Sequence, residues 1–245
     1  FMPDRTRRIF QVLAQEPLMH GFVLIGGTAL SIQIGHRLSE DLDFWLPGAA
    51  MSKNRVDAVL SNLGKSGIHH EYATPAWKIS QARINGIDLL SQSRDHIVDG
   101  VKVTFFARDD VPYQYFAGLH RIEGQAQFSI ADEDAIFNMK SWLISQRVRS
   151  RDLFDLMVLM QRGKRIQDIL DAGANADPSF QREYAKDVLV GNVPVDAEDE
   201  GFESIDLDLA IDDVHQYLLS AVNEYEVKIA AAIGTRLYPS AWGPN

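Results

Sequence analysis

The sequence predicts an α+β fold, in which a mixed sheet with flanking helices is followed by a mainly α-helical C-terminal region. Two observations lead to this prediction. Over the first half of the chain, short apolar or alternating runs typical of strands are interleaved with segments of helical period. After about Gly124 the strand signals stop and only helical periodicity continues.

The elements of the first half follow from their apolar spacing and from the residues that bound them. A fully apolar run followed by two glycines is typical of a buried strand that enters a tight turn, and strict alternation is typical of a half-buried strand. Threonine or serine ahead of an apolar-periodic segment is a typical helix cap. The elements expected are a helix at 5–15, a buried strand at 22–25, a helix capped by Thr28 that runs to about His36, a half-buried strand at 41–46 and a helix from Ser52 to about Gly64.

A β-hairpin is predicted around Asp99-Gly100. This dipeptide separates the apolar run 96–98 from the alternating run 101–106, and Asp-Gly between two such runs is a strong signal for a two-residue turn. Strand, helix, strand, helix and then a hairpin indicate a mixed sheet with helices packed on it.

The second half is predicted to be helical. Helices are expected at 132–146, 150–161, 163–172, 178–190 and 208–233, and the acidic stretch from Asp196 to Asp208 is expected to be a solvated loop. We therefore predict two domains, an α/β core at 1–127 and a helical domain at 128–245.

Composition and charge narrow the class of protein. The chain has 46% hydrophobic and 24% charged residues, no cysteine and no apolar run long enough to cross a bilayer, so we expect a cytoplasmic protein that does not span a membrane. Its net charge is −10, and the acidic excess lies after residue 125. Because acidic protein repels phosphates, a broad nucleic-acid-binding face is not expected, although the arginines and lysines within 147–165 form a candidate basic patch.

Asp41 and Asp43 are the first candidate site residues. They lie two apart on a predicted strand, so their side chains are expected on the same face. Two neighbouring carboxylates repel each other unless a cation or a proton lies between them, and Mg²⁺ accepts such a pair together with water and triphosphate oxygens. Alone, this pattern is weak evidence, because acidic pairs at strand ends are common on solvated edges.

Gly26-Gly27-Thr28 strengthens the interpretation. Glycines between a strand and a helix let the backbone approach a ligand, and the N-terminus of the following helix suits a phosphate group. This turn and the paired carboxylates are separated by one helix, so a phosphate site and a metal site are expected on neighbouring strands.

Five blocks of the sequence together resemble a known family. The blocks are Leu24–Leu30, Arg37–Phe44, Gly100–Phe106, Asp134–Lys140 and Arg151–Leu156. In this order they resemble the AbiEii/AbiGii toxin-type nucleotidyltransferases, which belong to the DNA polymerase β-like nucleotidyltransferase superfamily. The resemblance spans roughly residues 22–160, and the remainder matches only in being helical.

The resemblance implies roles for individual residues. It implies that Gly26, Gly27 and Thr28 hold the triphosphate and that Asp41 and Asp43 ligate Mg²⁺. It also implies catalytic roles for Lys140, Asp152 and Asp155, with the lysine neutralising phosphate. An ion-pair network that links two helices is an equally open interpretation of Arg151, Asp152 and Asp155. Arg37 and Ser39 either contact phosphate or position the strand that carries the carboxylates.

One position departs from the superfamily pattern. A third acid is usual on a later strand, and here that strand carries Lys102-Val103-Thr104. A threonine hydroxyl is a weak metal ligand and is no general base at neutral pH. Either Glu40 or Asp88 completes the site, or the enzyme works with one metal, or the protein binds nucleotide without turning it over.

Three functions remain open from the sequence. The leading hypothesis is an Mg²⁺-dependent enzyme that moves a nucleoside monophosphate from an NTP to a hydroxyl of RNA, such as tRNA, or of protein. The resemblance adds a toxin role, with a cognate antitoxin protein as partner. The alternatives are a degenerate module that binds nucleotide without catalysis, favoured by Thr104, and a transferase for a small molecule such as an antibiotic.

Overall fold

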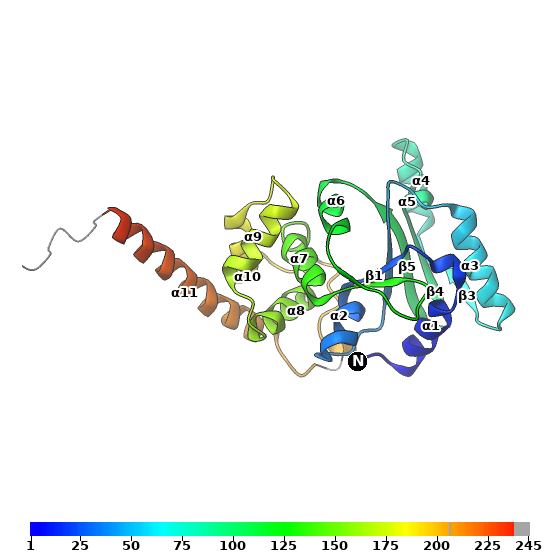
Figure 1. Ribbon diagram of the computed structural model, residues 1–245, viewed down its shortest axis with the longest axis horizontal. Coiled ribbons are helices and arrows are strands. Elements are labelled where there is room, and N and C mark those ends of the chain that lie inside the picture. The colour runs from blue at the N-terminus through cyan, green and yellow to red at the C-terminus, as the bar shows by residue number, and fades with distance from the viewer. Residues whose placement is uncertain (206, 238–245) are drawn as a thin grey trace, which may run out of the picture. The chain divides into compact units, whose positions relative to one another are not determined.

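The computed structural model describes residues 1–205 and 207–237 of the chain (Figure 1). The chain divides into two compact units. The first unit comprises residues 1–139 and 203–207, and the second comprises 140–202 and the chain from 208 onward. The sequence prediction placed the division at 127/128, whereas these units divide within one helix, between Met139 and Lys140.

The first unit is built on a mixed sheet. Its helices and turns are α1 (Asp4–Ala14), η1 (Pro17–Met19), α2 (Gly26–Ile34), α3 (Lys53–Lys65), α4 (Ala76–Ile84), α5 (Leu89–Gln92), α6 (Val111–Ala117), most of α7 (Glu133–Leu143) and η2 (Glu203–Ile205). Its strands are β1 (Val23–Ile25), β2 (Leu42–Pro47), β3 (His70–Tyr72), β4 (Ser93–Val98), β5 (Val101–Arg108), β6 (Arg121–Ile122) and β7 (Ser129–Ala131). Within the described residues the strands form one sheet in the order β3-β4-β5-β2-β1-β7-β6.

Alternation along the central strands separates an aromatic core face from a second face that is covered at Trp45 and partly exposed at Asp43. On β2 and β5, Phe44 and Phe105 are fully buried and stack with ring centroids 5.7 Å apart. Phe22 and Phe128 pack edge-on against this pair, which closes an aromatic core on one side of the sheet. Residues of the opposite parity, including Asp43 on β2, therefore face the other side.

The predicted hairpin is confirmed. Val98 of β4 pairs with Val101 of β5, and the two turn residues Asp99 and Gly100 have φ of 45° and 79°. Positive φ at both central residues is what a type I′ turn requires, and glycine and aspartate tolerate it better than most residues. The turn thereby fixes the register of β4 against β5.

Two predictions for the first unit were wrong. No strand was expected after about Gly124, but β7 pairs in parallel with β1 and thereby enters the sheet. Thr28 was expected to cap its helix, but α2 already begins at Gly26 and Thr28 lies inside its first turn. Strand β7 has three residues, too few to show a period, and its pairing with β1 on one side and β6 on the other defines it.

The second unit is helical in the part of the chain that is described. It contains the end of α7, then α8 (Ser150–Gln161), α9 (Ile166–Ala176), α10 (Arg182–Leu189) and α11 (Ile211–Leu237). These match the predicted helices in order, with boundaries shifted by a few residues. Along α8 the buried residues Leu153, Leu156 and Leu159 recur at helical spacing and form its core face.

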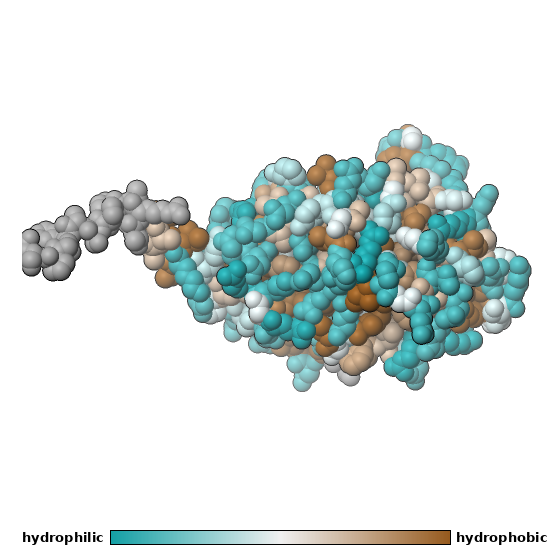
Figure 2. Space-filling model, viewed as in Figure 1, coloured by the Kyte–Doolittle hydropathy of each residue, from teal (hydrophilic) through white to brown (hydrophobic). Residues whose placement is uncertain are grey.

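The surface is mostly polar. The face seen in Figure 2 is largely hydrophilic, with apolar residues scattered in small groups. Among the residues described, no helix combines the length and the apolar character that a membrane span requires.

Candidate nucleotide and metal site

The glycine turn and Asp43 face each other in the first unit. β1 and β2 pair antiparallel with Ile25 opposite Asp43, so the turn that follows β1 reaches the start of β2. Gly26 has φ of 77°, and a Cβ placed on it would lie 3.1 Å from Oδ2 of Asp43. Only glycine combines this backbone conformation with so close an approach of the carboxylate. The bend therefore presents its backbone beside Asp43.

Arg37 lies beside the second glycine. A Cβ on Gly27 would collide with the Arg37 guanidinium and would come within 3.1 Å of Ser39 Oγ. The arginine is 8% exposed and donates a hydrogen bond of 2.9 Å to the carbonyl oxygen of Leu38. Its charge is thus held at the N-terminus of α2, where backbone N–H groups also point outward.

The hydroxyl of Thr28 is engaged by the loop that leads into β2. It hydrogen-bonds to the carbonyl oxygen of Asp41 and lies 2.8 Å from Ser39 Oγ. Because a hydroxyl has one proton, donation to the Asp41 carbonyl leaves Thr28 as the acceptor from Ser39. Thr28 is 2% and Ser39 6% exposed, so these side chains tie Asp41 to the helix rather than projecting to a ligand.

Thr104 occupies the position beside Asp43. In the parallel pairing of β2 and β5, Asp43 stands opposite Thr104, and in the antiparallel pairing of β5 and β4, Thr104 stands opposite Asp95. Directly opposed residues share one face of a sheet, so Asp43, Thr104 and Asp95 form one row across three strands. All three are partly exposed, unlike their buried neighbours in sequence.

The two acids that the sequence offered as replacements do not join this row. Asp88 stands at the start of α5 and forms a 2.7 Å ion pair with Lys53. Glu40 is exposed, and its backbone carbonyl accepts a hydrogen bond of 2.9 Å from Thr6 Oγ1. Asp95 was missed because its place in the row depends on strand register, although its position in the alternating strand β4 already put it on the face opposite the buried Arg94 and His96.

A cavity of about 550 Å³ lies beside Thr104 in the first unit. Its polar lining includes Ser93, Thr104 and Arg108, and Phe106 and Tyr113 supply aromatic surface. Tyr113 packs edge-on against Trp45, and both side chains are buried. The cavity therefore has a rigid aromatic side and a polar side next to the carboxylate row.

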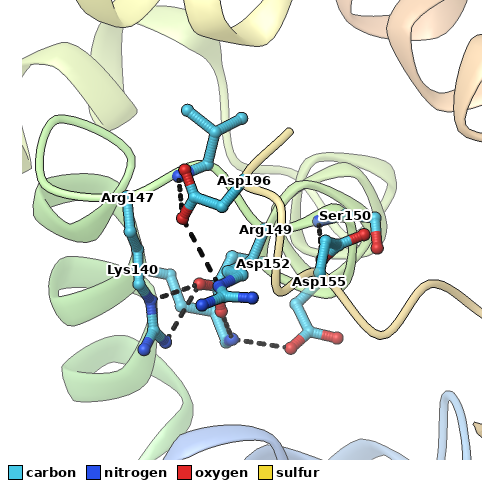
Figure 3. Close-up of polar contacts among 9 residues, drawn as sticks. Lys140, Arg147, Arg149, Ser150, Asp152, Asp155 and Asp196 are labelled. Atoms are coloured by element: carbon cyan, nitrogen blue, oxygen red, sulfur yellow. Dashed lines mark hydrogen bonds and ion pairs between the residues drawn. The ribbon is translucent and has the colours of Figure 1, made fainter. Parts of the chain in front are cut away.

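In the second unit, Lys140 is enclosed by two aspartates (Figure 3). Its Nζ lies 2.6 Å from Asp152 Oδ1 and 2.7 Å from Asp155 Oδ2, and the three side chains are 7% exposed or less. Arg147 adds a contact of 3.1 Å to Asp152. Burial opposes ionisation of Asp152, but the charges of Lys140 and Arg147 outweigh it and hold the Asp152 pKa below its ordinary value. An ion-pair network thus links α7 to α8, and a catalytic role for these residues stays a prediction.

Two arginines of the basic patch predicted within 147–165 are paired with the acidic segment 196–200. Arg149 contacts Asp196 and Glu198, both at 3.4 Å, and Arg151 contacts Glu200 at 2.7 Å (Figure 3 draws the Arg149–Asp196 pair). The segment is a loop, as expected, and Ala197, Glu198 and Glu200 are exposed. In addition, Asp196 and Asp199 accept hydrogen bonds from the backbone at the start of α8, which the prediction did not include. Opposite charges at long sequence separation are not visible in a local pattern.

The donor set of the first unit suits one hard cation. Among the described residues no group of three or more histidine, aspartate or glutamate side chains is arranged to hold a metal ion. Mg²⁺ needs fewer protein ligands, because it keeps several waters and takes one or two carboxylates plus substrate phosphates. Asp43 lies beside Gly26 and Asp41 stands directly ahead of β2, so a pair of metal ligands formed by these two residues stays a prediction.

The mixed sheet, the glycine turn before α2 and the aspartates at the start of β2 define a nucleotidyltransferase fold. The family described as "Nucleotidyl transferase AbiEii toxin, Type IV TA system" matches residues 7–197, and the chain belongs to this family. The expected family and fold class are thereby confirmed. An uncharacterized protein of Aquifex aeolicus (strain VF5) is 26% identical over 165 residues, which are 66% of this chain and 68% of that protein.

Two crystal structures from Helicobacter pylori are similar in fold. One, assigned as a candidate nucleotidyltransferase, has a TM-score of 0.51 at 18% identity and covers 93% of this chain and 96% of its own. The other, JHP933, has a TM-score of 0.50 at 16% identity, with 96% and 97% covered. At these identities the likeness concerns the fold alone.

Proposed function

We propose that the protein transfers a nucleoside monophosphate from an NTP to an acceptor hydroxyl, with Mg²⁺ held by Asp41 and Asp43. The observation that carries the proposal is the contact between the Gly26 backbone and the Asp43 carboxylate. A triphosphate at the N-terminus of α2 would lie against backbone N–H groups and next to the guanidinium of Arg37. The phosphates and the metal ligands are then adjacent.

In this proposal each residue has its own role. Gly26 and Gly27 admit the phosphates to the backbone, and Thr28 contributes its N–H, since its hydroxyl is engaged by Asp41. Arg37 neutralises phosphate charge, and Ser39 holds the loop through Thr28. When bound, Mg²⁺ supplies charge stabilisation for the pyrophosphate leaving group.

The ion pairs of Arg149 and Arg151 weaken the argument for RNA as the acceptor. Because Arg149 and Arg151 are paired with acids, the region they occupy offers less attraction to RNA than its sequence suggests. RNA, including tRNA, and protein hydroxyls both belong in the acceptor test. From the family description we also propose a toxin role, with an antitoxin protein as partner.

A second candidate function is nucleotide binding without transfer. It is favoured by Thr104, which stands opposite Asp43 where a third carboxylate would complete the superfamily pattern. This function keeps the glycine turn and the metal ligands but has no proton acceptor next to Asp43.

Incubation with α-³²P-labelled NTPs, Mg²⁺ and either total tRNA or a protein extract separates the two functions. We expect label on the acceptor with the wild type and loss of transfer in Asp41→Asn and Asp43→Asn. Glu40→Gln, which removes the same charge one residue away, should transfer normally. Tight NTP binding with no transfer by the wild type would establish the binding module instead.

A further inference from the structure

We propose that Asp95 supplies the carboxylate that position 104 lacks and accepts the proton of the acceptor hydroxyl. This inference rests on the proposed transferase function. It starts from the row across β2, β5 and β4, in which Asp43 is opposite Thr104 and Thr104 is opposite Asp95. The row places a second acid on the face of the sheet that carries Asp43, one strand beyond the position of the missing one.

Strand spacing assigns Asp95 a role different from that of Asp43. Neighbouring strands are about 4.8 Å apart, so two strand spacings separate the Asp43 and Asp95 backbones by about 10 Å. Mg²⁺ binds its ligands at about 2.1 Å, so one ion does not reach both carboxylates. Thr104 lies between Asp43 and Asp95 on β5, and the space between the two carboxylates has room for the acceptor oxygen instead.

The Asp95 carboxylate is available for this role. The side chain is partly exposed, and among the residues that the structure describes no hydrogen bond or ion pair engages it. Its backbone, by contrast, is fixed on both sides, because Asp95 N donates to Thr74 Oγ1 at 2.9 Å and Ala73 N donates to Asp95 O at 2.8 Å. The fixed backbone holds the strand position of Asp95, and the carboxylate is left able to accept a proton from a group within hydrogen-bond reach.

The cavity beside Thr104 supplies a place for the acceptor. Ser93, two residues before Asp95 on the same face of β4, lines it together with Thr104. Its volume of about 550 Å³ is enough for a nucleoside-sized group. An acceptor held there would present its hydroxyl at Thr104, between the carboxylates of Asp43 and Asp95.

The proposed step balances as follows. The acceptor O–H bond breaks, its proton goes to a carboxylate oxygen of Asp95, and the acceptor oxygen forms a bond to the α-phosphorus of the NTP. The bond from that phosphorus to its bridging oxygen breaks, and pyrophosphate leaves with the electron pair. Asp95 then returns the proton to solvent.

The test uses the full-length protein in single-turnover transfer with α-labelled NTP. Asp95→Asn should lower the transfer rate by about 10²- to 10⁴-fold, the usual contribution of a general base. The dissociation constant for binding of Mg²⁺–NTP to the protein should not change, and neither should the far-UV circular dichroism spectrum of the protein. The control is Glu71→Gln on β3. Glu71 is opposite Ile97 of β4, which lies on the same face of the sheet as Asp95. The control therefore removes one negative charge from the same face, on the strand next to that of Asp95.

A second variant tests the position of the carboxylate. In Asp95→Asn/Thr104→Asp the acid returns to the strand next to Asp43, and we expect at least tenfold recovery over Asp95→Asn alone. Wild-type rates in Asp95→Asn, with Asp43→Asn inactive, would overturn this inference and leave the transferase function standing. Equal losses in Asp95→Asn and Glu71→Gln would overturn it as well, and no transfer by the wild type would overturn both proposals.

Discussion

Lys140 shows how one buried side chain is stabilised by its partners. Asp152 and Asp155 each lie within 2.7 Å of its Nζ, and removal of the lysine takes away the cation that both buried carboxylates contact. Lys140→Met should therefore lower the free energy of unfolding by about 3–5 kcal/mol, measured by urea denaturation. The exposed Lys65→Met is the control and should change it by less than about 0.5 kcal/mol.

A triple variant separates charge from packing at this position. If unpaired carboxylates cause the loss, Lys140→Met/Asp152→Asn/Asp155→Asn should recover part of it, because no buried charge then lacks a partner. A loss below 1 kcal/mol in Lys140→Met would contradict a structural role and leave phosphate neutralisation as the reason for the lysine.

His96 links the stability of the first unit to pH. It is 2% exposed on the core face of β4, and neither ring nitrogen has a hydrogen-bond partner among the described residues. Burial, followed by the nearby Arg94 charge, lowers its pKa to about 4 from an ordinary 6.5. Between these values the unfolded chain binds the proton and the folded protein does not, so the stability is present above pH 6.5 and is lost as the pH falls toward 4.

The prediction is tested by comparing the wild type with His96→Leu at pH 7 and pH 4.5. The wild type should lose about 2–3 kcal/mol more than the variant over this range, because each unit of pKa shift corresponds to about 1.4 kcal/mol. The carboxylates titrate in both proteins, so their contribution to the change in stability cancels in the difference. Parallel curves for the two proteins would show that His96 does not cause the pH dependence.

At the scale of elements, the sequence predicts the strands and turns that a local residue pattern determines. It does not predict features that depend on which strands pair and in which register. The run 22–25, the alternation at 41–46 and the Asp99-Gly100 turn carry their own signals, and the corresponding strands and hairpin are present. Strand β7 is too short to show a period and exists through its pairing with β1 and β6. The neighbours of Asp43 follow from the register of β5 and β4, which involves residues some 50–60 positions away.

The acidic segment 196–200 is a second element whose role depends on distant partners. Asp199 accepts a hydrogen bond of 3.0 Å from Ser150 N at the start of α8, where backbone N–H groups lack helical partners. Asp199→Ala should cost about 1 kcal/mol of unfolding free energy in denaturation experiments, as for a lost helix cap. Asp208→Ala, an exposed acid further along the chain, should cost much less, and equal effects would contradict a capping role.

For the whole molecule, charge distribution argues against nonspecific attraction to nucleic acid. The net charge is −10, and the arginines at 149 and 151 are paired with acids within the second unit. The proposed nucleotide site would therefore depend on local groups, namely the backbone of the glycine turn and the guanidinium of Arg37. These groups attract phosphate at short range, where ionic screening is weak.

The rise in Tm on ligand binding tests whether NTP and Mg²⁺ bind at these groups in the intact protein. A ligand that binds only the folded state at about 100 times its Kd adds about 2.7 kcal/mol, which corresponds to about 5–10 °C in Tm for a chain of this size. We expect this rise when NTP and Mg²⁺ are added together to the wild type, measured by differential scanning calorimetry, and a smaller one with either alone. Asp43→Asn should abolish the difference because it removes a metal ligand, whereas Glu40→Gln should retain it. A rise of the same size in Asp43→Asn would mean that the nucleotide binds without the carboxylate beside Gly26, and the proposed site would then be wrong.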